Sequence, residues 1–331
     1  MRIAIYKDTF ANNRGADVAV RNLAAGLAGR GHATVLFEKP DLAKRLGERW
    51  DVLISAGTNE LLDLAAANVP LPPVIQQFQT EPAYSFRHWL RRWRRNRAIW
   101  GALRRVSAIQ VLRPIHATWL RAHAKGLSAS CPVAVIGNWA DFDVPVPMPE
   151  SVERLIICPG AINKDKNQRL LVKAFLRLAR EFPEWSLDLY GKARPRDEAG
   201  IRRFLASIPP RADGTCAIRL RGFCDLGEAY ARCAFVAFPS RTEGFPLAVI
   251  EAAAFGKPAV MIHDWIGTAA AGGGIVTEQT VSAYAAALRR LMADSALCAE
   301  MGRTARLFCN ARFSRAKILD QWESLLENVV N

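Results

Sequence analysis

Short apolar runs alternate with longer amphipathic segments along most of the chain. Such runs predict buried strands, because a strand covered on both faces carries no alternation of polar residues. In the first half they lie at Arg2–Tyr6, Thr34–Phe37, Val52–Ser55, Val74–Phe78, Ala108–Leu112 and Val133–Ile136. In the second half they lie at Leu155–Cys158, Ser186–Tyr190, Ile218–Arg221, Phe235–Phe238 and Ala259–Ile262.

Helical patterns separate these runs, for example at Ala16–Gly29, Asn167–Glu181 and Ala283–Met292. This alternation predicts α/β architecture with parallel sheets and right-handed crossovers. We expect two Rossmann-like domains that face a central cleft, with ligands beyond the carboxyl ends of the strands. The expected parts are an N-terminal acceptor-side domain over 1–143, a Pro-rich linker over 144–153, a C-terminal domain over 154–312, and a final helix over 313–331 for which a return to the first domain is one option.

Composition is compatible with this organisation. The 331 residues are 50% hydrophobic, enough for two cores of roughly 150 residues each. No uncharged apolar run reaches the roughly 18 residues of a spanning helix, and a strand at the start leaves no room for a signal peptide. Seven cysteines without C-x-x-C spacing indicate reduced thiols in the cytoplasm.

The segment 239–258 carries the clearest candidate chemistry. A turn with Gly244 follows the predicted strand, and Leu247–Phe255 then has a helical pattern. Two carboxylates, Glu243 and Glu251, lie eight positions apart around the start of this helix. Helix N-terminal amides suit a phosphate, and flanking carboxylates suit hydroxyl groups. The pattern predicts a site for a nucleotide sugar; on spacing alone, a capping and a surface glutamate are an equal alternative.

These residues also resemble a known family. Ser240-x-x-Glu-Gly-Phe-Pro-Leu-x-x-x-Glu251, with Gly-Lys-Pro258 after it, is similar to the E-x7-E motif of retaining glycosyltransferases of the GT-B fold, in particular family 4 (group 1). The segments Arg219–Phe223, Leu155–Gly160 and Val135–Asp141 resemble family segments that lie before the motif. The likeness covers the C-terminal half well and the N-terminal half loosely.

The resemblance implies roles for individual residues. Glu251 is expected to hold the donor ribose, Glu243 to lie near the donor sugar, and Lys166 to neutralise the diphosphate, with Glu243 and Lys166 as the catalytic pair. Backbone amides near the helix start are expected to face the sugar and phosphates, although Pro246 has no N–H to offer. Besides Glu251, the expected donor-binding residues are Gly244, Phe245, Leu247, Ala248, Gly160, Gly15 and Asn138.

Two positions depart from the family pattern. The arginine expected after Gly160 is Ala161, so Lys164 or Arg241 would have to supply that charge. Where the family often has a histidine, the chain has Gln79-Thr80-Glu81. No protein nucleophile is evident, which fits a front-face reaction in which the leaving phosphate helps to deprotonate the acceptor.

The sequence favours no metal site and no cofactor besides the nucleotide-sugar substrate. Asp141-Phe-Asp143 imitates the metal-binding D-x-D of another glycosyltransferase fold. It follows the approach to the linker rather than a nucleotide-binding strand, so we do not expect it to bind metal. The histidines show no ligand spacing.

Charge is the second strong signal. The net charge is +14, and 82–130 contains eleven Lys or Arg and no Asp or Glu. A helix is expected here. Near one side of it would lie Phe86, Trp89, Leu90, Trp93, Trp100 and Leu103. An anionic membrane surface is favoured, ahead of packing into the same domain and of nucleic acid. The membrane- or acceptor-facing residues are predicted to be Arg87, Trp89, Arg91, Arg92, Trp93, Arg94 and Arg95.

The sequence therefore predicts a retaining, metal-independent glycosyltransferase. It would move a sugar from a nucleotide-diphosphate donor to a glycan or lipid-linked acceptor, in cell-surface polysaccharide or lipopolysaccharide synthesis, at the inner face of the membrane. One alternative is a nucleotide-sugar epimerase or hydrolase, which the lack of a suitable histidine disfavours. Another is a nucleic-acid- or membrane-binding protein whose sugar site has decayed.

Overall fold

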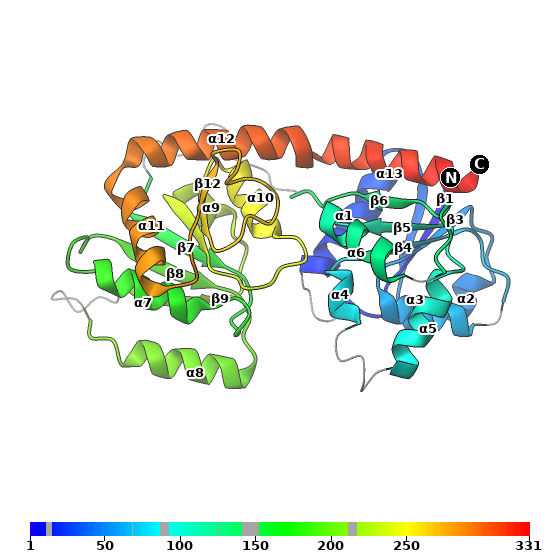
Figure 1. The fold of residues 1–331 in the computed structure, drawn as a ribbon, viewed down its shortest axis with the longest axis horizontal. Helices are drawn as coiled ribbons and strands as arrows, with labels where there is room; N and C mark the ends of the chain where they lie inside the picture. Colours follow the sequence, from blue (N-terminus) through cyan, green and yellow to red (C-terminus); the bar gives the residue numbers. More distant parts are fainter. Residues whose placement is uncertain (11–14, 68, 87–92, 125, 141–151, 211–216) are drawn as a thin grey trace. The chain divides into compact units, whose positions relative to one another are not determined.

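The computed structural model describes residues 1–331 except 11–14, 68, 87–92, 125, 141–151 and 211–216 (Figure 1). The chain divides into two compact units, which are described separately. Unit 1 comprises Met1–Trp139 and Phe313–Asn331, and unit 2 comprises Ala140–Arg312. Most of the predicted linker 144–153 lies outside the described residues.

Unit 1 contains a parallel sheet of six strands in the order β2-β1-β3-β4-β5-β6. Residues of alternating parity along β1 point to opposite faces, so Ile3 and Ile5 enter one core and Ala4 and Tyr6 the other. The strands are β1 (Arg2–Tyr6), β2 (Ala33–Phe37), β3 (Val52–Ser55), β4 (Val74–Gln77), β5 (Ala108–Val111) and β6 (Val133–Val135).

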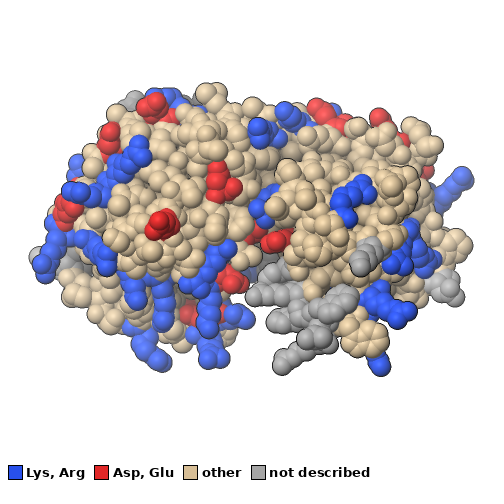
Figure 2. Space-filling view, in the orientation of Figure 1, with Lys and Arg blue, Asp and Glu red and all other residues tan. Residues whose placement is uncertain are grey.

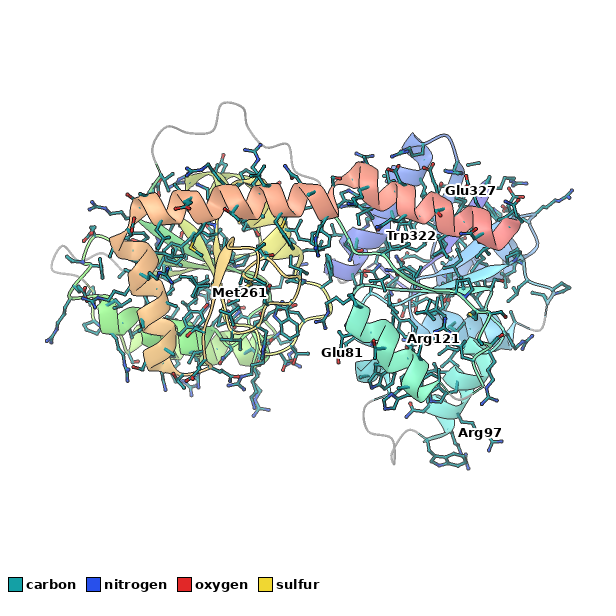
Figure 3. The ribbon with its side chains drawn as sticks, turned by 45° about the horizontal axis from the view of Figure 1, so that its top comes forward. Glu81, Arg97, Arg121, Met261, Trp322 and Glu327 are labelled. Atoms are coloured by element: carbon teal, nitrogen blue, oxygen red, sulfur yellow. The ribbon has the colours of Figure 1, made fainter. Side chains whose placement is uncertain are left out.

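Helices cover both faces of this sheet. On one face α1 and α13 share a core that includes Val20 and Trp322 (Figures 1 and 3). On the other face α3, α5 and α6 contribute Leu61, Ile99 and Leu120. The helices are α1 (Gly15–Gly29), η1 (Lys39–Asp41), α2 (Leu42–Leu46), α3 (Thr58–Ala66), α4 (Pro82–Ser85), α5 (Trp93–Leu103), α6 (Pro114–His123) and α13 (Arg315–Val330).

Unit 2 contains a second parallel sheet in the order β12-β11-β10-β7-β8-β9. Its strands are β7 (Leu155–Pro159), β8 (Ser186–Tyr190), β9 (Ile218–Gly222), β10 (Phe235–Phe238), β11 (Ala259–Met261) and β12 (Gly274–Val276). The eleven predicted strands all occur, with each end within one residue of the prediction. β12 escaped prediction because only three residues next to a run of glycines form it.

Helices also cover both faces of the second sheet. Phe175 and Leu288 from α7 and α11 enter one core, and Tyr230 and Phe255, from α9 and the end of α10, enter the other. Gly302 lets α12 pack closely against the turn at Gly256, because a Cβ at Gly302 would lie 1.9 Å from the carbonyl oxygen of Gly256. The helices are α7 (Gln168–Leu178), α8 (Pro195–Ala206), α9 (Gly227–Arg232), α10 (Leu247–Ala254), α11 (Val281–Ala293) and α12 (Ser295–Phe313).

The predicted fold class of two doubly wound parallel units is confirmed. In the described parts of the chain, no helix has both the length and the apolar composition that crossing a membrane requires. The six cysteines that the structure describes are all outside disulfides.

Candidate active site

The strand order of unit 2 reverses between β7 and β10. The chain runs outward from β7 through β8 and β9, and then returns to the other side of β7 to form β10. At such a reversal the loops after the two strands diverge, which leaves room for a ligand at their carboxyl ends. Here the two loops are joined by a hydrogen bond of 2.7 Å from the amide of Arg241 to the carbonyl of Asp165.

The loop after β7 is fixed by a close backbone approach. Gly160 has φ of 130° and donates its amide to the carbonyl of Tyr190. Gly191 lies so near that a Cβ would be 2.1 Å from the oxygen of Gly160, and only glycine fits there. The side chain of Asn163 then accepts the amides of Asp165 and Lys166, each at 3.0 Å. These contacts fix the backbone at Lys166 and therefore the position from which its side chain extends.

Lys166 and Glu243, the predicted catalytic pair, lie together. The Lys166 ammonium donates to Glu243 Oε1 at 2.5 Å, and it stands 5.1 Å from the centre of the Phe238 ring. Glu243 is buried and Lys166 is partly buried. Pairing offsets part of the cost of taking both charges out of water. An anionic ligand can therefore bind the Lys166 ammonium in place of the Glu243 carboxylate.

Glu251 lies in α10 and is held by a residue that the sequence did not reveal. The hydroxyl of Tyr230, in α9, donates to Glu251 Oε2 at 2.7 Å. Tyr230 is fully buried and stacks on Phe255. Burial raises the pKa of Glu251, and the hydrogen bond from Tyr230 opposes that rise. One carboxylate oxygen is thus anchored, and the other is the one that can meet a ligand.

The turn before α10 is formed by the predicted donor-binding residues. Gly244, Phe245, Leu247 and Ala248 are all partly exposed. The amide of Leu247 donates to the carbonyl of Phe245 at 3.0 Å, so in this conformation it closes the turn. Phe245 and Ala248 lie beside it, in the turn and in the first turn of α10.

The two candidates for the missing family charge differ in their surroundings. Arg241 is exposed, and its guanidinium donates to Asn167 Oδ1 at 3.3 Å, beside Lys166. Lys164 is also exposed. Arg241 is therefore the better placed substitute for the arginine absent at Ala161.

Two predicted donor-binding residues belong to unit 1. Gly15 is the first residue of α1, and the loop residues before it lie outside the described part. Asn138 is buried and donates to Gln79 Oε1 at 3.0 Å, so a pair of amides occupies the region where the family often has a histidine.

Asp141 and Asp143 lie outside the described residues. Among the residues that are described, no three His, Cys, Asp or Glu side chains gather in a way that could hold a metal ion.

The described residues of the tryptophan-rich segment, Phe86 and those from Trp93 onward, differ in their surroundings. Phe86 precedes α5 and stacks on Trp100 at 3.9 Å, within the core of unit 1, so the prediction that it shares a helix face with Trp93 is wrong. Trp93 is 50% exposed, with Arg94 over its ring. Arg95 turns toward α3, where it donates to Asn59 Oδ1 at 2.8 Å. Arg87, Trp89, Arg91 and Arg92 lie outside the described residues.

Two doubly wound units of this kind define the GT-B fold. The complex of Anabaena HepE with UDP and glucose has this fold, with a TM-score of 0.78, 17% identity and 99% of both chains covered. Residues 153–294 match the family described as "Glycosyl transferases group 1". The predicted resemblance to group 1 glycosyltransferases of the GT-B fold is therefore confirmed.

Curated relatives share part of the chain. An exopolysaccharide phosphotransferase of Streptomyces coelicolor is 28% identical over 185 residues, which is 54% of this chain and 19% of that protein. An uncharacterized glycosyltransferase of Haemophilus influenzae is 24% identical over 178 residues, which is 52% of this chain and 49% of that protein. The chain thus spans less than half the length of these relatives.

The Tyr230–Glu251 contact predicts a pH-dependent loss of stability. Tyr230→Phe leaves the partly buried Glu251 carboxylate without this donor, which should cost about 1–3 kcal/mol of unfolding free energy when Glu251 is ionised. The variant raises the already raised pKa of Glu251 further. The extra cost should therefore be small at about pH 4.5 and should grow as the pH rises to about 8.

Urea unfolding at both pH values measures this difference. Tyr284→Phe is the matched control, because the buried Tyr284 hydroxyl donates to the carbonyl of Val260, which does not titrate in this range. The control should lose the same stability at both pH values. Equal pH dependence in the two variants would contradict the assigned contact.

Proposed function

We propose that the chain is a retaining, metal-independent glycosyltransferase that moves a sugar from a nucleotide-diphosphate donor to a glycan or lipid-linked acceptor. The observation that carries the proposal is the placement of Lys166, Glu243 and Glu251 around the strand reversal of unit 2. The group 1 family match over 153–294 supports it. So does the structural neighbour in complex with UDP and glucose.

In this proposal unit 2 binds the donor. Glu251 accepts hydrogen bonds from the ribose hydroxyls through the oxygen that Tyr230 leaves open. The Lys166 ammonium exchanges its partner Glu243 for the donor diphosphate. Glu243 then accepts hydrogen bonds from the donor sugar. Hydroxyl groups suit both carboxylates because a hydroxyl donates a hydrogen bond and an ionised carboxylate accepts it.

Catalysis then consists of stabilising the leaving group. The bond between the anomeric carbon and the diphosphate oxygen breaks, the acceptor oxygen bonds to that carbon on the same face, and the acceptor proton passes to the leaving diphosphate. Negative charge grows on the diphosphate during this step. Lys166 and the amides at the start of α10 are placed to stabilise it before the reaction begins.

The acceptor is proposed to be a polysaccharide or lipopolysaccharide intermediate. The name of the Streptomyces relative refers to exopolysaccharide, which supports this class. The exposed Trp93, with Arg94 over its ring, supports an approach to an anionic membrane surface, since an indole with flanking cations suits the lipid headgroup region.

Nucleotide binding tests the core of the proposal. Isothermal titration with UDP and with GDP should show binding of at least one of them. Glu251→Ala should weaken that binding by about 2–4 kcal/mol, because hydroxyl bonds to a charged acceptor are lost. Glu300→Ala, an exposed glutamate in α12, should leave the affinity unchanged. If neither nucleotide binds, the proposed function is wrong.

Lys166 should act mainly on turnover. Lys166→Ala should lower kcat more than donor affinity, since the leaving charge is largest in the transition state. EDTA should leave the activity in place, because the lysine and not a metal is proposed to carry that role. Donor turnover measured by mass spectrometry decides both points. Full activity of Lys166→Ala would transfer the role to Arg241 or Lys164, and activity restored by manganese after EDTA would refute metal independence.

The basic segment should bind anionic vesicles. Each basic residue near such a surface contributes about 1 kcal/mol, and the attraction fades beyond a Debye length. Arg97 points outward from α5 (Figure 3), whereas Arg95 turns inward and is kept. The test variant replaces Arg91, Arg92, Arg94 and Arg97 with Gln. Flotation with anionic vesicles should be lost, with nucleotide binding intact.

A charge-matched control separates this segment from other basic surface. Basic side chains also gather around α8 (Figure 2). The control replaces Arg177, Arg180, Arg196 and Arg203 with Gln, which are exposed residues of unit 2. It should still float. Release by the control alone would move the membrane contact to unit 2, and a wild type that binds single-stranded nucleic acid instead would refute the membrane proposal.

A further inference from the structure

Two neighbouring helices of unit 2, α7 and α8, present a basic surface. Arg169, in the first turn of α7, donates to the carbonyl of Gly200 in α8 at 3.4 Å. Its guanidinium also stands 5.5 Å from the centre of the Phe204 ring, in the same helix as Gly200. These contacts join the two helices side by side. Lys and Arg side chains gather over this part of the molecule (Figure 2).

The cations of the two helices lie on adjoining sides. In α7 they recur at every fourth residue from Arg169 to Arg177, on the side away from the buried Phe175. In α8 they stand four residues before and three residues after Gly200, which is the side that contacts α7. We name six exposed cations the α7–α8 ridge: Arg169, Lys173, Arg177, Arg180, Arg196 and Arg203.

The charge of the ridge is not neutralised within the protein. Residues 164–206 contain eleven Lys or Arg and six Asp or Glu, which gives a net charge of +5. The acids of α8, Asp197 and Glu198, pair with arginines outside the ridge, and Glu181 pairs with an arginine of α11. Apart from Arg169, the ridge cations form no ion pair or side-chain hydrogen bond with the residues that the structure describes.

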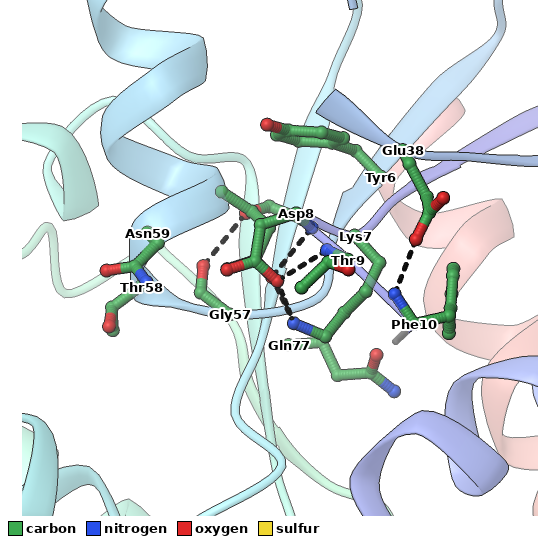
Figure 4. A network of polar contacts seen from close by, with 12 residues as sticks. Tyr6, Lys7, Asp8, Thr9, Phe10, Glu38, Gly57, Thr58, Asn59 and Gln77 are labelled. Atoms are coloured by element: carbon green, nitrogen blue, oxygen red, sulfur yellow. Dashed lines mark hydrogen bonds and ion pairs between the residues drawn. The ribbon is translucent and has the colours of Figure 1, made fainter. Parts of the chain in front are cut away.

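The ridge differs in this respect from the lysines at the strand ends. Lys7 of unit 1 is shared by the carboxylates of Asp8 and Glu60 (Figure 4), and Lys166 pairs with Glu243. A cation that protein covers needs such a partner, because it has lost part of its hydration. An exposed cation stays hydrated and needs none. The ridge can therefore bind an external anion without breaking a contact inside the protein.

The surroundings of the ridge discriminate among anionic partners. None of the exposed large apolar residues in the described part of the chain belongs to α7 or α8. Contact with a lipid interface uses apolar or indole side chains, and single-stranded nucleic acid stacks its bases on aromatic rings. Protein interfaces bury aromatic anchors. Because the ridge offers none of these, its recognition depends on charge and hydrogen bonds alone.

A linear anionic polysaccharide fits such a surface. Its carboxylates, sulfates or phosphates are separated by hydrated sugar rings, which require no apolar contact. Successive cations along α7 are about 5–6 Å apart, whereas the charges of duplex DNA follow one another about every 1.7 Å of the helix axis. Five of the six ridge cations are arginines, whose planar guanidinium can bind a carboxylate or a phosphate through two hydrogen bonds.

We infer that the α7–α8 ridge binds an anionic polysaccharide chain. The choice of a polysaccharide rests on the proposed function, under which the chain is the glycan that the reaction extends. Because α7 begins directly after the loop of Lys166, the ridge starts beside the candidate donor site. It continues along the helix for about 16 Å, at about 1.5 Å per residue. A glycan bound there remains near the site of transfer.

Fluorescence anisotropy on the full chain tests this inference. The anionic probes are a labelled oligogalacturonide and a labelled heparin fragment, and the neutral probe is a dextran fragment of the same length. At least one anionic probe should bind, and its affinity should fall about 10-fold or more between about 50 and 200 mM salt, because binding releases counterions. The dextran fragment should not bind.

A combined variant assigns the binding to the ridge. It replaces four exposed ridge arginines with Gln: Arg177, Arg180, Arg196 and Arg203. The variant should keep its fold, which circular dichroism checks. It should bind the anionic probe about 10-fold or more weakly, since several exposed charge contacts are lost together.

A charge-matched control separates the ridge from the net charge of unit 2. It replaces four exposed arginines of α11 and α12 with Gln: Arg290, Arg303, Arg306 and Arg312. These positions lie on other helices, so the affinity for the anionic probe should stay within about twofold of the wild type. An equal loss in the control and in the ridge variant would overturn the inference.

The remaining outcomes separate this inference from the proposed function. If UDP or GDP binds but neither anionic probe does, the ridge assignment is overturned and the nucleotide site stands. The assignment is also overturned if dextran binds as well as the anionic probes, or if a DNA duplex displaces them at a lower concentration of charge. If neither nucleotide binds, the proposed function fails, while the comparison of ridge variant and control still decides whether the ridge binds an anionic polysaccharide.

Discussion

Both units depend on one topological constraint, the reversal of strand order in a parallel sheet that helices cover on both faces. Backbone hydrogen bonds inside such a sheet are satisfied and helices cover its faces, so ligands bind at the loops that follow the strand ends. At the two reversals, between β1 and β3 and between β7 and β10, neighbouring loops leave in opposite directions. The Lys7–Glu60 and Lys166–Glu243 pairs lie at these reversals, one in each unit.

The two pairs share a physical logic. Each joins a lysine from the loop after the first strand of its sheet to a glutamate that follows the neighbouring strand along the sheet. A carboxylate that is buried beside its cation is already desolvated and oriented, so a ligand that enters has less reorganisation to cause. The difference lies in the surroundings. Two carboxylates share Lys7, whereas Lys166 pairs with Glu243 and is followed by Asn167, which accepts a hydrogen bond from Arg241.

The sequence predicted strands well because buried parallel strands are continuous apolar runs, and β12 was missed because it is only three residues long. The family motif predicted Glu243 and Glu251, and the likeness of the loop after the strand at Leu155 predicted Lys166. The pair of Lys7 and Glu60 could not be predicted in this way, since 53 positions separate them and only the pairing of β1 with β3 brings them together. Likewise, Trp93 and Trp100 have the same helical phase, and only tertiary packing decides that one is exposed and the other stacked.

The net charge of +14 is therefore a property of the protein surface and does not indicate the charge at the two strand reversals, where the lysines are paired with glutamates. Exposed charges act over a Debye length of about 8–10 Å and influence how anionic partners approach, in a way that salt weakens. Buried pairs are screened much less and decide which ligand stays. Arg94 and Arg95 show that one basic run in the sequence can serve both purposes, since Arg94 is exposed beside Trp93 while Arg95 turns to Asn59 at the start of α3. The role of each arginine in such a run therefore depends on its own contacts, and the number of charges alone does not place all of them at the surface.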